Sequence, residues 1–164
     1  MKFTAKKLLA FLLSMILLVA LCACEGGSDE GESYYVSHKG AKICPGEAAG
    51  DLLDQLGAPK SEKENGNCGG QGVQMRYTYD SFYLYLLEST DGKVTVDAIE
   101  FRDDLIETAE GLGIGSSKDE VLKAYGDPTE EKGQTLTYKN GKQHLVINLK
   151  NDAVSALSLK HVTQ

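Results

Sequence analysis

Two stretches of this sequence follow the same pattern at a constant offset of 69 residues. The first runs from Ile43 to Pro59 and the second from Leu112 to Pro128. In both, a glycine is followed six residues later by two adjacent apolar residues, then by a third apolar residue, a glycine, any residue and a proline. An internal repeat indicates a chain built from two similar units, so this pattern constrains the fold more than any single motif does.

Each repeat predicts one short helix with a marked beginning and end. Ser117 and Glu120 have the spacing of a capping box, which satisfies the first free N–H groups of a helix. The apolar spacing predicts a single buried face on each helix. A glycine suited to a left-handed C-cap, with a proline two residues later, should end each helix: Gly57 with Pro59, and Gly126 with Pro128.

Strand patterns follow each helix. Strands are expected at 73–80, 82–88 and 94–102 in the first half and at 134–138, 143–150 and 153–160 in the second, with Asp91-Gly92, Asn140-Gly141 and Asn151-Asp152 as turns. The first half also carries an apparent insert between helix and sheet, at 65–72. We therefore predict an α+β fold: a tandem duplicated unit of a short helix followed by a three-stranded antiparallel meander, with the helices on one sheet face.

The N-terminal segment differs in kind from the rest. Three lysines precede the apolar run Leu8–Leu21, which is shorter than the ~20 residues of a spanning helix. The following Leu21-Cys22-Ala23-Cys24 resembles the lipobox of bacterial lipoproteins, in which the cysteine becomes residue 1 of the mature chain and carries a diacylglyceryl group. This resemblance implies a signal peptide at 1–23 and lipidation of Cys24. A buried core helix or a retained anchor is the alternative.

Charge and composition set the remaining domain limits. The formal net charge is −7, and the first 23 residues hold three lysines and no acid, so the remainder carries −10. This balance argues against a nucleic-acid partner, which requires a basic footprint. Residues 24–33, rich in glycine, serine and acid, predict a flexible tether that reaches about 15–18 Å. The two repeats then occupy 34–104 and 105–164.

The second repeat also carries a family resemblance. The stretch Val-Leu-Lys-Ala-Tyr-Gly-Asp-Pro at 121–128, followed by a three-stranded meander, resembles small lipoproteins of clostridia-like Gram-positive bacteria, and more distantly the β-lactamase-inhibitor-protein and BamE types of unit. The resemblance covers about residues 34–160. It implies an extracytoplasmic binding module, lipid-anchored to the cell membrane, and carries over no catalytic residue. The insert around Cys68 departs from the inhibitor-like pattern.

Cys44 and Cys68 allow three interpretations. A disulfide between them would close a loop of about 25 residues and contribute roughly 3 kcal/mol of stability in an exported protein. Two free thiols are the second possibility. The third is a reactive thiol at Cys44, lowered in pKa by a helix N-terminus. The three histidines, His38, His144 and His161, show no recognisable arrangement with it.

Other motifs give ordinary interpretations. The glycine-rich stretch 111–117 lacks the ending of a phosphate-binding loop and is expected to be a turn. Asp103, Asp104 and Glu107 lack calcium-loop spacing and are expected to form a solvated connector. His144, opposite in alternation to Leu145, is expected to be exposed. No cofactor, metal site or catalytic residue is predicted.

A candidate ligand surface follows from the strand Phe82–Leu86, which is apolar or aromatic on both faces. If one face meets the helices, the other presents Tyr83 and Tyr85, and beside them the neighbouring strand presents Gln74, Arg76 and Thr78. Tyrosine with arginine is typical of contact hot spots. The alternatives are burial under a second layer or a partner copy, and plain cross-strand packing.

These observations favour a non-enzymatic binding module for a protein or cell-wall ligand. The alternatives are an inhibitor or stability factor for an extracellular enzyme and, third, a thiol-dependent redox protein that uses Cys44.

Overall fold

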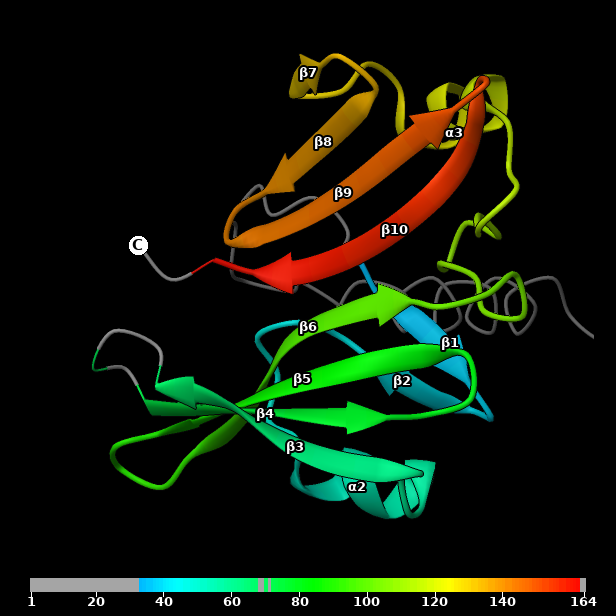
Figure 1. Cartoon of the computed structure of the whole chain (residues 1–164). Helices are drawn as coiled ribbons and strands as arrows, with labels where there is room; N and C mark the ends of the chain where they lie inside the picture. The colour runs from blue at the N-terminus through cyan, green and yellow to red at the C-terminus, as the bar shows by residue number, and fades with distance from the viewer. Residues whose placement is uncertain (1–32, 68–69, 71, 163–164) are drawn as a thin grey trace, which may run out of the picture.

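The computed structural model of this chain describes residues 33–67, 70 and 72–162 (Figure 1). The predicted signal peptide at 1–23, Cys24, the tether up to residue 32 and Cys68 lie outside the described residues. In chain order the elements are β1 (Val36–His38), β2 (Ala41–Ile43), α2 (Gly50–Leu56), β3 (Ser61–Asn67), β4 (Gly72–Thr78), β5 (Phe82–Ser89), β6 (Val94–Phe101), α3 (Lys118–Tyr125), β7 (Glu130–Lys132), β8 (Thr135–Asn140), β9 (Gln143–Lys150) and β10 (Ala153–His161). Neither helix has the length or apolar content to span a bilayer, and the described part of the chain offers no other candidate.

The architecture is one large antiparallel sheet. Its eight strands follow the order β3-β4-β5-β6-β10-β9-β8-β7, while β1 and β2 form a separate two-stranded hairpin. The pairing of β6 with β10 joins the two halves, with Ile99 opposite Leu159 and flanking pairs on either side. Figure 1 shows the resulting continuous sheet, from β7 at the top to β3 at the bottom.

The prediction of an α+β fold made of tandem helix-plus-meander units is wrong. The structure is mostly β, and its strands belong to one shared sheet rather than to two three-stranded units. Each half contributes four strands, because β3 and β7 add an outer strand that the sequence pattern did not reveal. Both are edge strands that bury little, so they show no apolar alternation, and charged sequences of this kind protect a sheet edge.

The segment interpreted as an insert, at 65–72, is part of this outer hairpin. β3 runs to Asn67 and β4 begins at Gly72, so most of the segment either extends the two strands or joins them. Gly66 lies opposite Gln74, after an irregularity in the register. Of the glycines that suggested a loop, Gly66 lies in a bulged strand and Gly70 in a turn.

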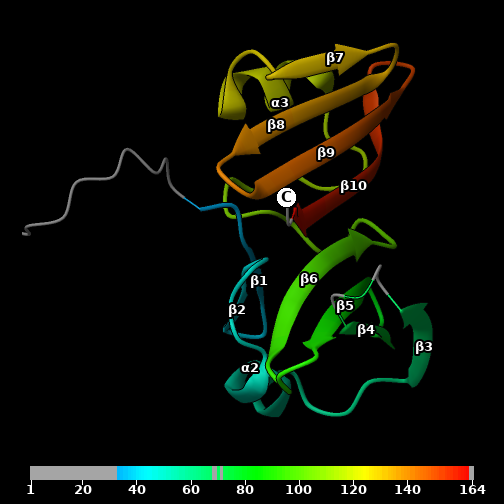
Figure 2. The same cartoon turned by 90° about the vertical axis from the view of Figure 1, so that its left-hand side faces the viewer.

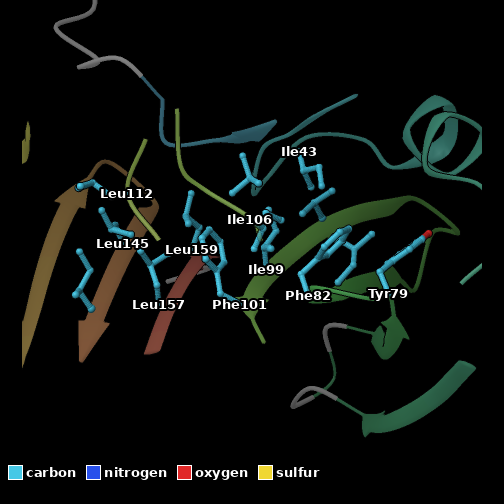
Figure 3. Packing of buried hydrophobic residues seen from close by; sticks show 14 of the residues in the cluster. Ile43, Tyr79, Phe82, Ile99, Phe101, Ile106, Leu112, Leu145, Leu157 and Leu159 are labelled. Atoms are coloured by element: carbon cyan, nitrogen blue, oxygen red, sulfur yellow. The ribbon is translucent and has the colours of Figure 1, made fainter. Parts of the chain in front are cut away.

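A single hydrophobic core lies on one face of the sheet (Figure 3). Ile99 of β6 is paired with Leu84 on one side and Leu159 on the other, and all three are buried. Figure 2 shows the β1–β2 hairpin and α2 on the same side of the sheet, and α3 beside the upper strands. Leu52 and Leu56 of α2 and Val121 of α3 belong to the same cluster as the sheet residues, so both helices cover this one face.

The two sequence repeats dock onto the sheet through matching hydrogen bonds. The N–H of Gly46 donates to the carbonyl of Val96 at 2.7 Å, and the N–H of Gly115 donates to that of Val154 at 2.8 Å. Later in each half, a tyrosine hydroxyl donates to the carbonyl of the glycine after the helix: Tyr79 to Gly57 at 3.2 Å and Tyr138 to Gly126 at 3.1 Å. The repeats therefore mark equivalent attachment points within one sheet.

The predictions for the helix ends are only partly confirmed. The predicted capping box is confirmed: the N–H of Glu120 donates to the Ser117 hydroxyl, and the Glu120 carboxylate accepts from the N–H of Ser117 at 2.7 Å. The predicted left-handed caps are wrong in ψ, because Gly57 has φ 72° and ψ −173°, and Gly126 has φ 71° and ψ −152°. This region is accessible almost only to glycine, so the residue type is still required.

Candidate ligand-binding face

The second face of the sheet points away from both helices. We call it the open face; its central side chains are Gln74, Arg76, Thr78, Tyr83, Tyr85, Asp97, Glu100, His144, Ser158 and Lys160. Figure 1 looks onto this face, and Figure 2 shows it edge-on, opposite the hairpin and α2. Within the ranges described, neither helix nor the β1–β2 hairpin lies over it.

The strand register brings the expected surface residues together. Tyr83 lies opposite Thr78 and Tyr85 lies opposite Arg76 across the β4–β5 pair. Gln74 sits one step further along β4, opposite Leu87, and its amide reaches the carboxylate of Asp97 on β6. The side chains of both tyrosines are partly exposed. Their role as a ligand surface stays a prediction.

The aromatic ring of Tyr83 contacts the side chains of two arginines. The guanidinium carbons of Arg76 and Arg102 each lie 4.9 Å from the centre of its ring. Each cation is attracted to the aromatic ring, by about 0.5–1 kcal/mol at a partly exposed site. Arg102 is further fixed because its Nη1 donates to the carbonyl oxygens of Tyr79 and Asp80, at 2.7 and 2.9 Å. The ring therefore holds the arginines in place and is itself largely occupied by them.

Tyr85 is held by a different partner. Its hydroxyl donates a hydrogen bond of 2.9 Å to the carboxylate of Glu100. Burial raises the pKa of Tyr85, and the hydrogen bond and charge of Glu100 raise it further, while Arg76 acts in the opposite direction. The phenol is thus a neutral donor under physiological conditions, with its hydrogen already committed.

A hollow of about 410 Å³ lies at the centre of the open face. It crosses the junction of the two halves, since β6 and β10 contribute most of its walls, and the small side chain of Ala98 leaves room for it. A register irregularity in the β5–β6 pair accompanies it. The lining residues are Gln74, Tyr85, Asp97, Ala98, Glu100, Ser158, Lys160 and His161.

Basic side chains form one row across the open face. Following the paired residues from β3 to β8 gives Lys63, Arg76, Tyr85, Ala98, Lys160, His144 and Lys139, which we call the basic row. Sequence reasoning missed Lys63 because β3 was not predicted, and it missed Lys160 and Lys139 because the pairing of β6 with β10, which brings their strands beside Arg76, was not predicted. Only the β6–β10 pairing shows that Arg76 and Lys160 belong to the same row.

The pKa of His144 is lowered partly by the positive charges of the neighbouring lysines. Burial lowers its pKa first, the neighbouring Lys139 and Lys160 lower it further, and only Glu130 opposes them. His144 is partly buried rather than simply exposed as predicted. At neutral pH the imidazole is therefore uncharged and offers one N–H donor.

Charge is unevenly distributed between the two sides of the molecule. Along the paired strands, the open face carries seven lysine or arginine side chains (Lys63, Arg76, Arg102, Lys132, Lys139, Lys150 and Lys160) and three carboxylates (Asp97, Glu100 and Glu130). The chain as a whole has a formal net charge of −7. Acidic residues gather elsewhere, with Asp51 and Asp54 on α2 and Asp119 and Glu120 on α3. The open face is therefore basic on an acidic protein.

Cys44 is buried away from the open face, with an exposed fraction of 2%. Its Sγ accepts a hydrogen bond from the amide of Gln143 at 3.1 Å. Burial raises the pKa of the thiol, although the hydrogen bond from Gln143 opposes this effect. A raised pKa is the opposite of what a thiol nucleophile requires. Since Cys68 lies outside the described residues, the predicted bridge stays a prediction.

The glycine-rich stretch and the acidic connector have local roles. The N–H of Gly115 is occupied by Val154, and that of Gly113 donates to the Ser116 hydroxyl at 3.1 Å. These amides are therefore used within the protein, as the turn interpretation requires. In the connector, Asp103 accepts from the N–H of Leu105 at 3.0 Å. Among the described residues, no group of three or more potential metal ligands occurs.

Comparison with known proteins gives little guidance. No family model matches the chain, and no curated protein matches it. A solved structure of a DUF4309 family protein, YjgB from Bacillus subtilis subsp. subtilis str. 168, is similar with 14% identity and a TM-score of 0.42, covering 73% of this chain and 82% of that chain. A likeness of this size leaves fold and function to be argued from the chain's own residues. The lipoprotein, inhibitor-like and BamE-like resemblances stay predictions.

The basic row predicts a specific change in the titration of His144. Replacing Lys160 with glutamine removes one of the two charges that depress its pKa, so the pKa should rise toward its ordinary value. The measurement is an NMR titration of the imidazole signals in the full-length protein in detergent micelles. Lys123→Gln on α3 is the matched control and should leave the pKa unchanged. An unaltered His144 titration in Lys160→Gln would contradict the proposed neighbours.

Proposed function

We propose that this protein is a lipid-anchored extracytoplasmic binding module at the cell membrane, which holds a protein or cell-wall ligand on its open face without catalysing a reaction. The observation that carries the proposal is the open face itself. It combines arginine, tyrosine and a polar hollow on one side of a sheet whose other side is buried by the hairpin and both helices.

The arrangement of the arginines supports a contact role. Tyrosine and arginine are enriched among residues that contribute most to binding. Ordering a long side chain on binding costs roughly 0.5–1.5 kcal/mol. Because Tyr83 already restrains Arg76 and Arg102, part of this cost falls on folding instead of on association. The face is thus suited to binding with little rearrangement.

The path of the chain supports the proposed orientation. In Figure 2 the blue segment that leads into β1 lies on the side of the hairpin, away from the open face. A tether that begins at a lipidated Cys24 would join the body on that side. Attachment on that side leaves the open face turned away from the point of anchoring and accessible to a ligand.

The anchor predicts where a Cys24 variant will be found. Without the thiol no diacylglyceryl group can be attached, so Cys24→Ser should leave the membrane fraction or remain with its signal peptide uncleaved. The measurement is cell fractionation with intact-mass analysis, and Cys22→Ser is the matched control that should stay lipidated. A Cys24→Ser protein that stays on the membrane with its signal peptide removed would contradict lipidation at this residue.

The open face predicts the effect of removing its central contacts. Cross-linking and capture from native membranes and cell-wall fragments should recover at least about tenfold less partner with Arg76→Ala/Tyr83→Ala/Tyr85→Ala than with the wild type, because hot-spot residues each contribute ~2 kcal/mol or more. Equal thermal unfolding midpoints would show that the variant still folds.

The hairpin supplies a matched control for this experiment. There Lys42 lies 4.5 Å from the ring centre of Tyr35, an isolated cation–aromatic pair outside the open face. Tyr35→Ala/Lys42→Ala should retain full recovery. Equal recovery by the wild type and the triple variant would refute the open-face proposal, and turnover of a substrate by the purified protein would refute its non-catalytic part.

A further inference from the structure

We propose that the ligand of the open face is a linear phosphodiester polymer that lies across the strands along the basic row. This inference rests on the proposed function and specifies its ligand. The row provides five basic side chains, Lys63, Arg76, Lys160, His144 and Lys139, in consecutive paired positions interrupted only by Tyr85 and Ala98.

The dimensions of the row fit a chain-like ligand. Neighbouring strands lie about 4.8 Å apart, so the six steps from β3 to β8 span roughly 29 Å. Lys63 and Arg76 form one cationic group, and Lys160 and Lys139 form a second on the far side of the hollow, with the uncharged His144 between them as an N–H donor. A small anion would reach only one group, whereas a polymer can contact both.

Two lysines of the basic row are available to a ligand. Within the described part of the chain, no carboxylate lies within 4.0 Å of the Nζ of Lys63 or Lys160, whereas Lys139 pairs with Glu130 at 3.2 Å. The two carboxylates in the hollow already accept hydrogen bonds, Asp97 from Gln74 and Glu100 from Tyr85.

The twist of the sheet favours a flexible polymer over a flat surface as the ligand of the basic row. Adjacent strands are rotated by about 20–25°, so six steps turn the row through roughly 120–150°. Side chains that fan out in this way cannot all meet a planar bilayer or a rigid flat partner at once. A flexible chain can follow the twist and contact successive cations.

The chemistry of the side chains favours phosphate groups without attached bases. Lysine ammonium groups act as point charges for phosphate oxygens, and the arginine fork fits them with two hydrogen bonds. Single-stranded nucleic acids additionally require free aromatic faces for base stacking. Here Tyr83 lies against two guanidinium groups, so its ring offers no open stacking platform.

The test uses the full-length protein in nanodiscs of neutral lipid. The probe is a synthetic poly(glycerol phosphate) long enough to span the row, titrated calorimetrically at several salt concentrations and compared with a single phosphodiester unit. We expect the polymer to bind far more tightly than the single unit. Its affinity should fall steeply with salt, because bound phosphates release counterions.

The decisive variant removes one cation from each group. Lys63→Ala/Lys160→Ala should weaken polymer binding at least about tenfold and reduce the slope of log affinity against log salt by ~2, since each phosphate contact contributes ~1. Lys42→Ala/Lys123→Ala removes the same charge from the hairpin and α3 and should change neither quantity. Equal weakening by both variants would overturn the proposal.

Other ligands define the remaining outcomes. Tighter binding of polyglutamate, oligothymidylate or anionic vesicles than of poly(glycerol phosphate) would overturn the proposal in favour of an acidic peptide, a nucleic acid or a membrane surface. So would a failure of the polymer to bind. If capture of a partner still depended on Arg76, Tyr83 and Tyr85 in that case, the proposed function would stand and only its ligand class would be wrong.

Discussion

The pairing of β6 with β10 is the interaction on which the rest of the structure depends. It joins the sheet of the first half to that of the second through Ala98, Ile99 and Glu100 opposite Lys160, Leu159 and Ser158. On one face, the central pair of apolar residues merges two sets of buried side chains into one core. On the other, the flanking pairs place side chains from both halves around one hollow. The core and the candidate site therefore lie on opposite faces of the same few paired residues.

The two sides of the sheet also differ in charge. The core face must be covered, and the elements that cover it present acidic side chains to solvent, such as Asp51 on α2 and Asp119 on α3. The open face carries the lysines and arginines of alternate strand positions. An acidic body with one basic face is repelled by anionic surfaces in most orientations and attracted in one, which favours a defined orientation of binding.

Many of the local elements could be predicted from the sequence, but their assembly could not. The residues that begin and end each helix predicted both helices, and apolar alternation with turn residues predicted six strands. The capping box at Ser117 is confirmed. β3 and β7 were not predicted because edge strands bury too little to show a pattern, and the three-residue strands β1 and β2 were not predicted either. The joining of the two halves was not predicted because the pairing of β6 with β10 links residues about 60 positions apart, which no local signal specifies. For the same reason Arg76, Tyr83 and Tyr85 could be grouped from one predicted hairpin, whereas Lys160 and His144 could not be added to them.

Residue-resolved lysine labelling tests the central claim most directly, namely that one continuous face holds one ligand across the junction. Full-length protein in neutral nanodiscs would be acetylated briefly at increasing concentrations of poly(glycerol phosphate), and each lysine's modification measured by mass spectrometry. Lys63 from the first half and Lys160 from the second should become shielded together, with a single shared midpoint, while Lys42 and Lys123 keep their reactivity. Shielding of only one of the two, separate midpoints, or equal shielding of all four would contradict this account.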